Sequence, residues 1–216
     1  MEIILCTKTE YLYFKEYIQT FIKDKILILY DENTPKIIKP YICWCIRRIP
    51  FDKLNGQQIK FINTEQLSVP SKLEEYQKYA LPGIEIYDYS LENIKISGKG
   101  TYLPYTEVPQ ETEKLKRFLT QKKEYDFAII GTPSDHRAKH IDKLRKKGYT
   151  INHIHGWNDE RDIQVGKCKN LLNLHYNSDY KLYEPIRCER WRFAGMPIYS
   201  EECLDLPDGI KLLTEL

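Results

Sequence analysis

The chain has 216 residues, of which 42% are hydrophobic and 30% are charged, and its formal net charge is +2 at neutral pH. This hydrophobic content supplies a packed core, whereas the near-neutral charge gives no whole-molecule field that would attract a polyanion. The longest apolar run, around Ile26 to Tyr30, is far shorter than the roughly 20 residues that cross a bilayer, which excludes a membrane-spanning protein.

The cysteines are predicted to be reduced thiols in a cytoplasmic protein. They are Cys6, Cys43, Cys45, Cys168, Cys188 and Cys203. They lack paired C-x-x-C spacing, and no leader with a basic start and an apolar centre precedes them. None lies in an activating context, so a cysteine nucleophile is not expected. Cys43, Trp44 and Cys45 fall in an apolar run and are predicted to be core residues.

Residues 1–100 are predicted to form a first α/β half. Apolar runs with strand character lie at 3–6, 26–30, 41–46, 59–62 and 84–87. A helix is expected from Tyr11 to Ile22 with Thr9 as its cap, and a shorter one begins at Pro70. Polar residues follow two of the strands, at 63–66 and at 88–93. Strands that end in polar residues are typical of the ligand-binding edge of an α/β sheet.

Residues 101–216 are predicted to form a second α/β half, because the composition changes at Ser97 to Gly100. A helix is expected at 112–120, a strand at 125–130, a helix from the cap Ser134 to Lys147, and a strand at 149–155. Gly156 to Asn158 then form a predicted turn, and the following charged residues a loop.

The clearest unit is the segment from Leu171 to Glu202, which is predicted to fold as strand, loop, helix and strand. Pro185 suits the first turn of the helix and Gly195 suits its end. In a parallel unit of this kind, ligands bind at the carboxyl ends of the strands and at the amino end of the helix. The residues expected there are His175, Tyr176, Tyr183, Glu184 and Arg187.

Several residues that could bind a ligand or a metal could instead have a purely structural role or lie at a solvated surface. Gly131 and Arg137 could hold a phosphate at the start of a helix, or Arg137 could be a solvated residue of a capped surface helix. His136 and His140 are one helical turn apart, but no H-E-x-x-H pattern surrounds them, so a solvated face is preferred over a metal site. His153 and His155 are expected to point to opposite faces of a strand.

No phosphate-binding loop, G-x-G-x-x-G pattern or Asp-x-Asp pair occurs in the sequence. Neither a bound metal nor a cofactor is therefore expected. A diphosphate would have to be neutralised by Arg, Lys and helix amino ends.

An ordered set of motifs resembles the GT-B class of glycosyltransferases, nearest to the group 1 (family 4-like) enzymes. The motifs are NTEQ at 63–66, YDYSLEN at 87–93, YLPY at 102–105, AIIGTPSDHR at 128–137, HGW at 155–157, RD at 161–162, LNLHY at 172–176, YEPIRCER at 183–190 and GMPIYSE at 195–201. The resemblance implies two Rossmann-like halves that face a central cleft, in a shortened form of the class. The first half, 1–100, would bind the acceptor and the second, 101–216, a nucleotide-sugar donor.

The resemblance also assigns residues to the donor. Glu184 would bind the ribose, Gly131, Arg137 and Arg187 would lie along the diphosphate, and Gly156 and Trp157 would border the nucleobase. The family pattern has a second glutamate eight positions after the first, where this chain has Arg192. Counting back from Gly195 and Pro197 places that glutamate at Arg190 instead.

The expected function is thus the metal-independent transfer of a sugar from a nucleotide-sugar to a glycan, lipid-linked or protein acceptor. Glu65 and Asp88, at strand ends of the first half, are the candidates for a catalytic base, and hydrogen bonding to loop backbone is their other interpretation. The alternative function is an inactive nucleotide- or glycan-binding relative, or a subunit of a larger transferase. Nucleic acid is not an expected partner, and homo-oligomerisation is left open.

Overall fold

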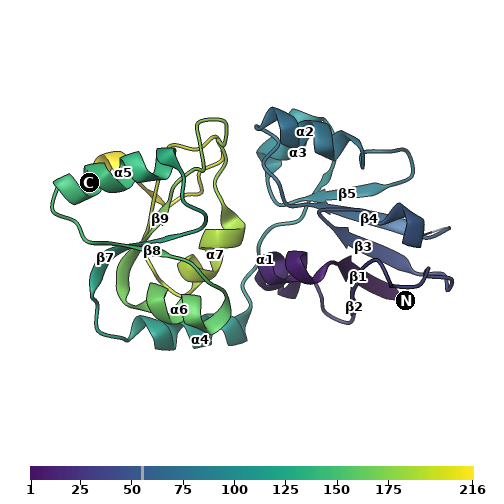
Figure 1. Cartoon of the computed structure of the whole chain (residues 1–216), viewed down its shortest axis with the longest axis horizontal. Helices are drawn as coiled ribbons and strands as arrows, with labels where there is room; N and C mark the ends of the chain where they lie inside the picture. Colours follow the sequence, from purple (N-terminus) through teal and green to yellow (C-terminus); the bar gives the residue numbers. More distant parts are fainter. Residues whose placement is uncertain (55) are drawn as a thin grey trace. The chain divides into compact units, whose positions relative to one another are not determined.

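The computed structural model describes residues 1–54 and 56–216. They form two compact units, Met1–Tyr105 and Thr106–Leu216. Each unit contains a parallel β-sheet with helices packed on it (Figure 1). Seven α-helices occur in the described part of the chain. The predicted α/β class is therefore confirmed, and the two parallel sheets are consistent with two Rossmann-like units.

Unit 1 is a six-stranded parallel sheet with the strand order β2-β1-β3-β4-β5-β6. The strands are β1 (Glu2–Cys6), β2 (Ile26–Leu29), β3 (Ile42–Ile46), β4 (Gln58–Asn63), β5 (Glu85–Asp88) and β6 (Thr101–Tyr102). The helices are α1 (Lys8–Gln19), α2 (Pro70–Gln77) and α3 (Leu91–Ser97), with a short 3-10 turn, η1 (Phe51–Lys53). In Figure 1, α1 lies on one side of this sheet and α2 and α3 lie on the other.

The central strands of unit 1 are continuous apolar runs because both faces of the sheet are covered. Ile3 and Leu5 of β1 pack with Phe61 of β4 and Tyr76 of α2 in one buried core cluster. Cys43, Trp44 and Cys45 of β3 are buried, as predicted.

The first helix begins earlier than expected. Its cap is Thr7, whose hydroxyl accepts a hydrogen bond from the Glu10 backbone N–H at 3.1 Å, while the Glu10 carboxylate accepts one from the Thr7 N–H at 2.9 Å. This reciprocal capping box satisfies both backbone donors. The prediction of Thr9 as the cap was therefore wrong.

Unit 2 has the strand order β11-β10-β9-β7-β8, and every pairing is parallel. The strands are β7 (Tyr125–Ile130), β8 (Ile151–Ile154), β9 (Cys168–Asn173), β10 (Ile198–Ser200) and β11 (Lys211–Leu212). The helices are α4 (Pro109–Leu119), α5 (Asp135–Lys146), α6 (Asn158–Gly166) and α7 (Pro185–Phe193), and a 3-10 turn, η2 (Leu213–Glu215), ends the chain. The predicted parallel unit is confirmed as β9, α7 and β10.

The sheet of unit 2 has a core on each face. Leu115 of α4, Val165 of α6 and Trp191 of α7 belong to one buried cluster, and Ile141 and Leu144 of α5 belong to another. Figure 1 shows α4 and α6 together on one side of the sheet and α5 on the other. Residues 158–162 are part of α6, so the prediction of a charged loop there was wrong.

Helices α4, α6 and α7 are held together by a buried ion network. Arg190 of α7 donates hydrogen bonds to both carboxylate oxygens of Asp162 in α6, at 2.7 and 2.9 Å, and it also bonds Glu111 of α4. Arg161 adds a bond of 2.9 Å to Asp162. A Cβ at Gly166 would lie only 2.5 Å from the Phe118 carbonyl oxygen, so α4 and α6 approach each other where only glycine fits.

The boundary between the units lies between Tyr105 and Thr106, whereas sequence analysis placed it after residue 100. The difference has a clear cause, because β6 (Thr101–Tyr102) pairs with β5. The Tyr17 hydroxyl also donates a 2.6 Å hydrogen bond to the Leu103 carbonyl, and the Tyr17 and Tyr105 rings stack. These residues complete unit 1.

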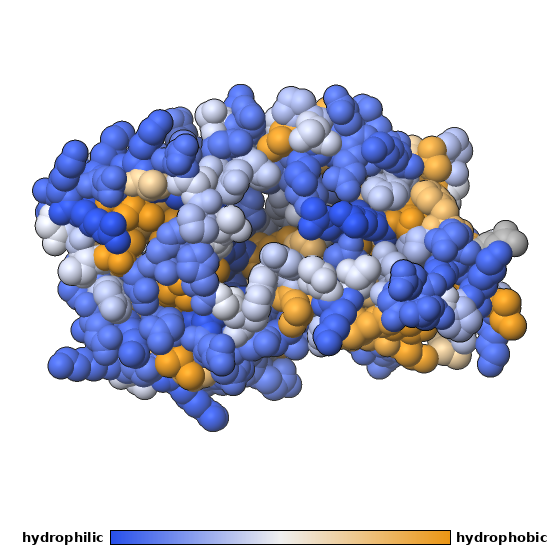
Figure 2. Space-filling model, viewed as in Figure 1, coloured by the Kyte–Doolittle hydropathy of each residue, from blue (hydrophilic) through white to orange (hydrophobic). Residues whose placement is uncertain are grey.

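Figure 2 shows hydrophilic residues over most of the face that it draws, with hydrophobic residues in separate groups between them. Within the described residues, no helix is both long enough and apolar enough to cross a membrane.

Candidate functional site

The carboxyl edge of the unit 2 sheet collects most of the predicted site residues. Because β7, β8, β9 and β10 are parallel, their carboxyl ends meet at one edge of the sheet. Gly131 follows β7, Gly156 follows β8, His175 follows β9 and Glu201 follows β10. The amino ends of α5 and α7 begin from the loops that follow β7 and β9. This edge is the candidate functional site.

Arg137, in the first turns of α5, is buried and bonded to backbone. Its guanidinium donates to the Leu174 carbonyl at 3.1 and 3.0 Å and to the Thr132 carbonyl at 2.6 Å. Burial and the neighbouring Arg187 lower the pKa of Arg137 to about 10, which still leaves it a cation at neutral pH. The interpretation of Arg137 as a solvated surface residue is therefore wrong.

Gly131 is needed for this arrangement. Its φ of +124° lies in a region that residues with a side chain rarely adopt, and a Cβ there would be 2.8 Å from Nη1 of Arg137. In this structure the group that approaches the Gly131 backbone is thus the Arg137 side chain.

A second guanidinium approaches the same carbonyl. Arg187 of α7 donates from Nη1 to the Leu174 oxygen at 3.4 Å, and its Nη2 lies 3.9 Å from the Glu184 carboxylate. Glu184 is the residue at the amino end of α7, where its side chain does not cap the helix. Two arginines therefore converge on one backbone oxygen beside two helix amino ends, a setting that favours anions.

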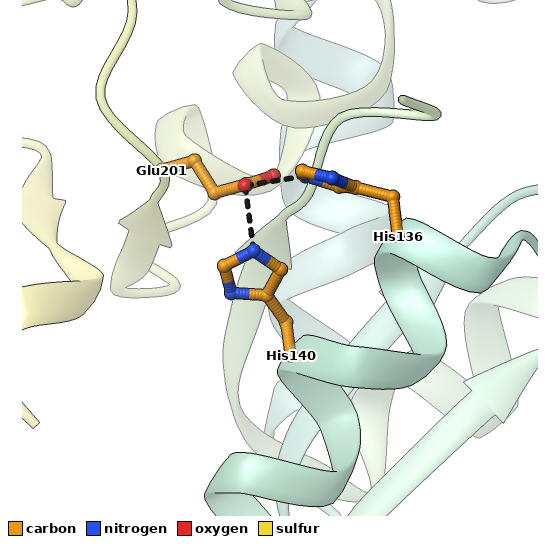
Figure 3. A group of neighbouring side chains, drawn as sticks. All are labelled: His136, His140 and Glu201. Atoms are coloured by element: carbon orange, nitrogen blue, oxygen red, sulfur yellow. Dashed lines mark hydrogen bonds and ion pairs between the residues drawn. The ribbon is translucent and has the colours of Figure 1, made fainter. Parts of the chain in front are cut away.

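A carboxylate and two imidazoles meet at the same edge (Figure 3). Oε1 of Glu201 lies 2.7 Å from Nε2 of His136 and 2.9 Å from Nε2 of His140. Both histidines are on α5, and about a quarter of each side chain is exposed, at 27% and 28%. The prediction of a solvated face for them was wrong, since both rings point to Glu201.

His175, in the loop after β9, supports this group. Its backbone N–H donates to Oε2 of Glu201 at 2.6 Å, and its Nε2 lies 3.3 Å from the Cys203 sulfur. Burial raises the pKa of Glu201, but hydrogen bonds from His140, the His175 N–H and His136 outweigh it and bring that pKa to about 2. Burial lowers the pKa of His175 and raises that of Cys203 to about 12. Cys203 is therefore a thiol at neutral pH and not an activated nucleophile.

The aromatic candidates lie at the outer part of the edge. Trp157 is 37% exposed and precedes α6, and Gly156 is exposed beside it. Tyr176 is 42% exposed, with the Arg137 guanidinium 5.9 Å from its ring centre. The rings of His153 and His155 stack with centroids 4.9 Å apart, so the prediction of opposite faces was wrong. Strand β8 ends at Ile154, and the alternation of side chains ends with it.

The two candidates for a catalytic base lie in unit 1 and have internal partners. Asp88 is 1% exposed, and it accepts hydrogen bonds from Asn63 at 2.6 Å, from the Ser90 N–H at 2.9 Å and from Asn93 at 3.0 Å. Glu65 is 2.8 Å from Arg47 and 3.3 Å from Lys72. Asp88 thus holds the loops after β4 and β5 together, and Glu65 is paired with two cations.

Glu201 and Cys203 were not among the site residues predicted from the sequence. The available signal was an H-x-x-x-H pair on the helix after β7 together with an acidic residue after β10. These features become neighbours only when β10, β9 and β7 are known to be adjacent in that order.

No protein-family model matches the sequence. The chain is similar to mimivirus proteins. Uncharacterized protein L138 of Acanthamoeba polyphaga mimivirus is 36% identical over 228 residues, which cover 93% of this chain and 25% of that protein. Uncharacterized protein L137 of the same virus is 34% identical over 93% of this chain and 29% of its own length. For Uncharacterized protein L140 the identity is 34%, over 89% of this chain and 66% of that protein. The chain thus spans about a quarter of the length of the first two relatives.

Proposed function

We propose that the protein transfers a sugar from a nucleotide-sugar donor, and that the donor diphosphate binds at the carboxyl edge of the unit 2 sheet. The observation that carries the proposal is the convergence of Arg137 and Arg187 on the Leu174 carbonyl oxygen. Because the carbonyl oxygen of Leu174 is uncharged, it does not neutralise the two guanidinium groups, which remain able to bind an anion. The order of the GT-B-like motifs along the chain supports the same function.

Each residue has a separate part in donor binding. Arg187, which is partly exposed, would bond the diphosphate, whereas the buried Arg137 would supply charge and fix the Leu174 loop. Glu184, one helical turn before Arg187, would accept hydrogen bonds from the ribose hydroxyls. Gly156 and Trp157 would border the nucleobase, with His175 and Tyr176 lining the loop after β9.

The chemical step requires stabilisation of the departing diphosphate. Negative charge develops on its oxygens as the glycosidic bond breaks, and the Arg187 guanidinium with the amino ends of α5 and α7 would stabilise that charge. No paired carboxylates are needed to hold a metal against the diphosphate. The sugar acceptor would be a glycan, a lipid-linked sugar or a protein.

A second candidate function is a nucleotide- or glycan-binding relative without activity, or a subunit of a larger transferase. The internal bonds of Asp88 and the ion pairs of Glu65 favour it, because a base must be accessible to the acceptor hydroxyl. The greater lengths of the mimivirus relatives are in keeping with a module of a larger protein.

Calorimetric titration with nucleoside diphosphates in excess EDTA tests the donor site. We expect binding to persist in EDTA. Glu184→Gln should weaken the binding of nucleoside and diphosphate alike, by about 1.5 to 3 kcal/mol, the range for hydrogen bonds to charged groups. Arg187→Ala should weaken diphosphate binding more than nucleoside binding, because an arginine–phosphate bond is charge-assisted.

The matched controls are Glu160→Gln and Arg145→Ala, which change exposed residues of α6 and α5. Both controls should bind like the parent protein. Unchanged affinities in Glu184→Gln and Arg187→Ala would remove the donor-site assignment. Release of free sugar from a nucleotide-sugar by the parent protein separates the enzyme from the inactive relative.

A further inference from the structure

We propose that His136, His140 and Glu201 bind one Zn²⁺ ion. The site goes beyond the proposed donor site and does not depend on it. In the described residues, 1–54 and 56–216, these side chains form a group whose three ligand atoms all lie within 4.8 Å of one another. The ligands are two imidazole nitrogens and one carboxylate oxygen, a set that zinc commonly takes from proteins.

The backbone fixes the two nitrogens on one face of α5. His136 and His140 are four residues apart in a helix that runs from Asp135 to Lys146, so their side chains lie one above the other. Their ring centroids are 4.9 Å apart, and both Nε2 atoms are directed at the same oxygen of Glu201 (Figure 3). Convergent nitrogens of this kind need only a small adjustment to share an ion.

The distances suit a tetrahedral ion. Zn–N and Zn–O bonds of about 2.0 to 2.2 Å place neighbouring ligand atoms roughly 3.4 Å apart. Here the carboxylate oxygen lies 2.7 and 2.9 Å from the two nitrogens. A withdrawal of the Glu201 side chain by roughly half an ångström would therefore open the centre for the ion.

The carboxylate is oriented by a partner of its own. Oε2 of Glu201 accepts the His175 N–H at 2.6 Å, which leaves Oε1 directed at the two imidazoles. Fixed carboxylates of this kind favour metal binding because the ligand does not have to be ordered by the ion. Nε2 of His175 contacts the Cys203 sulfur, so the three ligands leave the fourth position to water.

The location also allows entry. The side chains of His136 and His140 are 27% and 28% exposed, and that of Glu201 is 12% exposed. Two neutral imidazoles and one carboxylate with Zn²⁺ carry a net charge of +1, which the positive amino end of α5 does not neutralise. The bound water should therefore be exchangeable for an anionic ligand.

The test uses the full chain without an affinity tag, because a histidine tag would itself bind zinc. Protein saturated with Zn²⁺ and passed through a desalting column is analysed by elemental mass spectrometry, and affinity is measured by calorimetry. We expect one zinc per chain. His136→Gln and His140→Gln should each weaken binding at least tenfold, and the double variant should lose it. Co²⁺ should give the intense visible absorption of a four-coordinate site.

His155→Gln is the matched control, because His155 is an exposed histidine of the same unit. It should bind zinc like the parent protein. Circular dichroism should show that the variants keep their helices, because both histidines lie at a partly exposed helix face. A parent protein that retains no zinc, or histidine variants that retain as much as His155→Gln, would overturn the proposal.

Discussion

Gly131 and Arg137 form a pair in which each residue requires the other. The glycine leaves the space that the guanidinium occupies, and the guanidinium fixes the Leu174 carbonyl at the edge of the sheet. A change of either residue should therefore disturb the whole edge, although Arg137 itself is only 3% exposed.

We predict that Gly131→Ala destabilises unit 2 by about 1.5 to 3 kcal/mol more than Gly148→Ala. Both glycines have positive φ, but a Cβ at Gly148 meets nothing within 4 Å, whereas one at Gly131 meets Arg137 at 2.8 Å. The extra cost is that of lost hydrogen bonds to a charged group. Chemical denaturation measures it, and equal effects of the two substitutions would contradict the close approach.

The sequence shows which residues could have a chemical role, but it does not show which residues they bond to in the folded protein. Arg187 and Glu184 were predicted from their positions at a helix start, which is a local property. Glu201 could not be found in this way, because it follows strand β10 and its partners His136 and His140 come from helix α5, far away in the sequence. Asp88 was predicted from its position at the end of β5, but its hydrogen bonds with the side-chain amides of Asn63 and Asn93 were not.

At the level of elements, Arg190 is one of the two positions at which the resemblance to the GT-B class would place a second glutamate, and the structure gives it internal partners. Arg190 is 5% exposed and lies within the network that joins α4, α6 and α7. Burial alone would raise the pKa of Asp162, but the hydrogen bonds and charge of Arg190, with Arg161, lower it below its usual value. The network should therefore stabilise unit 2 in a pH-dependent way.

We predict that Asp162→Asn costs about 3 kcal/mol at neutral pH, because it leaves buried arginines without their carboxylate. The pKa of Asp162 is lower in the folded protein than in the unfolded chain. Its contribution is thus complete above the ordinary aspartate pKa of about 3.9 and is lost as the pH falls through the folded value. The difference in unfolding free energy between parent and variant should shrink below about pH 4.

Asp142→Asn is the control, since its side chain is 67% exposed and lies 4.0 Å from Arg145. It should change the unfolding free energy by no more than about 0.5 kcal/mol. A loss in Asp162→Asn that stays the same at all pH values would show that packing, and not charge, is responsible.

The longer strands were predictable, whereas the two-residue strands β6 and β11 and two of the helices were not. A buried parallel strand is a short apolar run, so β7 was predicted with the bounds that the structure has. Helix α6 begins with a run of charged residues, and its buried face includes Arg161 and Asp162. Their partner Arg190 comes from α7, and no local pattern reveals it. Helix α3 was missed because it follows the polar end of β5 directly.

At the level of the whole molecule, each unit has its own sheet and its own buried clusters. Thr101 and Tyr102, which were predicted to begin the second half, belong to the sheet of unit 1. The covalent connection therefore passes from one complete sheet to the next helix, α4, within a few residues.

We predict that residues 1–105 and residues 106–216 each fold when expressed separately. Each fragment should show a cooperative unfolding transition, because the central strands and their covering helices stay within one fragment. The second fragment should also retain the zinc and nucleoside diphosphate affinities of the full chain. Division at residue 100 is the comparison, and it should destabilise the first fragment by removing β6. A non-cooperative unfolding transition of residues 106–216 would contradict the prediction that this unit folds on its own.

Each unit contains buried cysteines whose reactivity reports local unfolding of that unit. Cys6, Cys43 and Cys45 lie in unit 1 and Cys168, Cys188 and Cys203 lie in unit 2, all as free thiols, and only Cys203 is not fully buried. A thiol-specific reagent can reach the buried sulfurs only when the surrounding sheet opens. Mass spectrometry of labelled peptides therefore resolves the opening free energies of the two halves of one intact chain, without a fluorophore or an engineered cysteine.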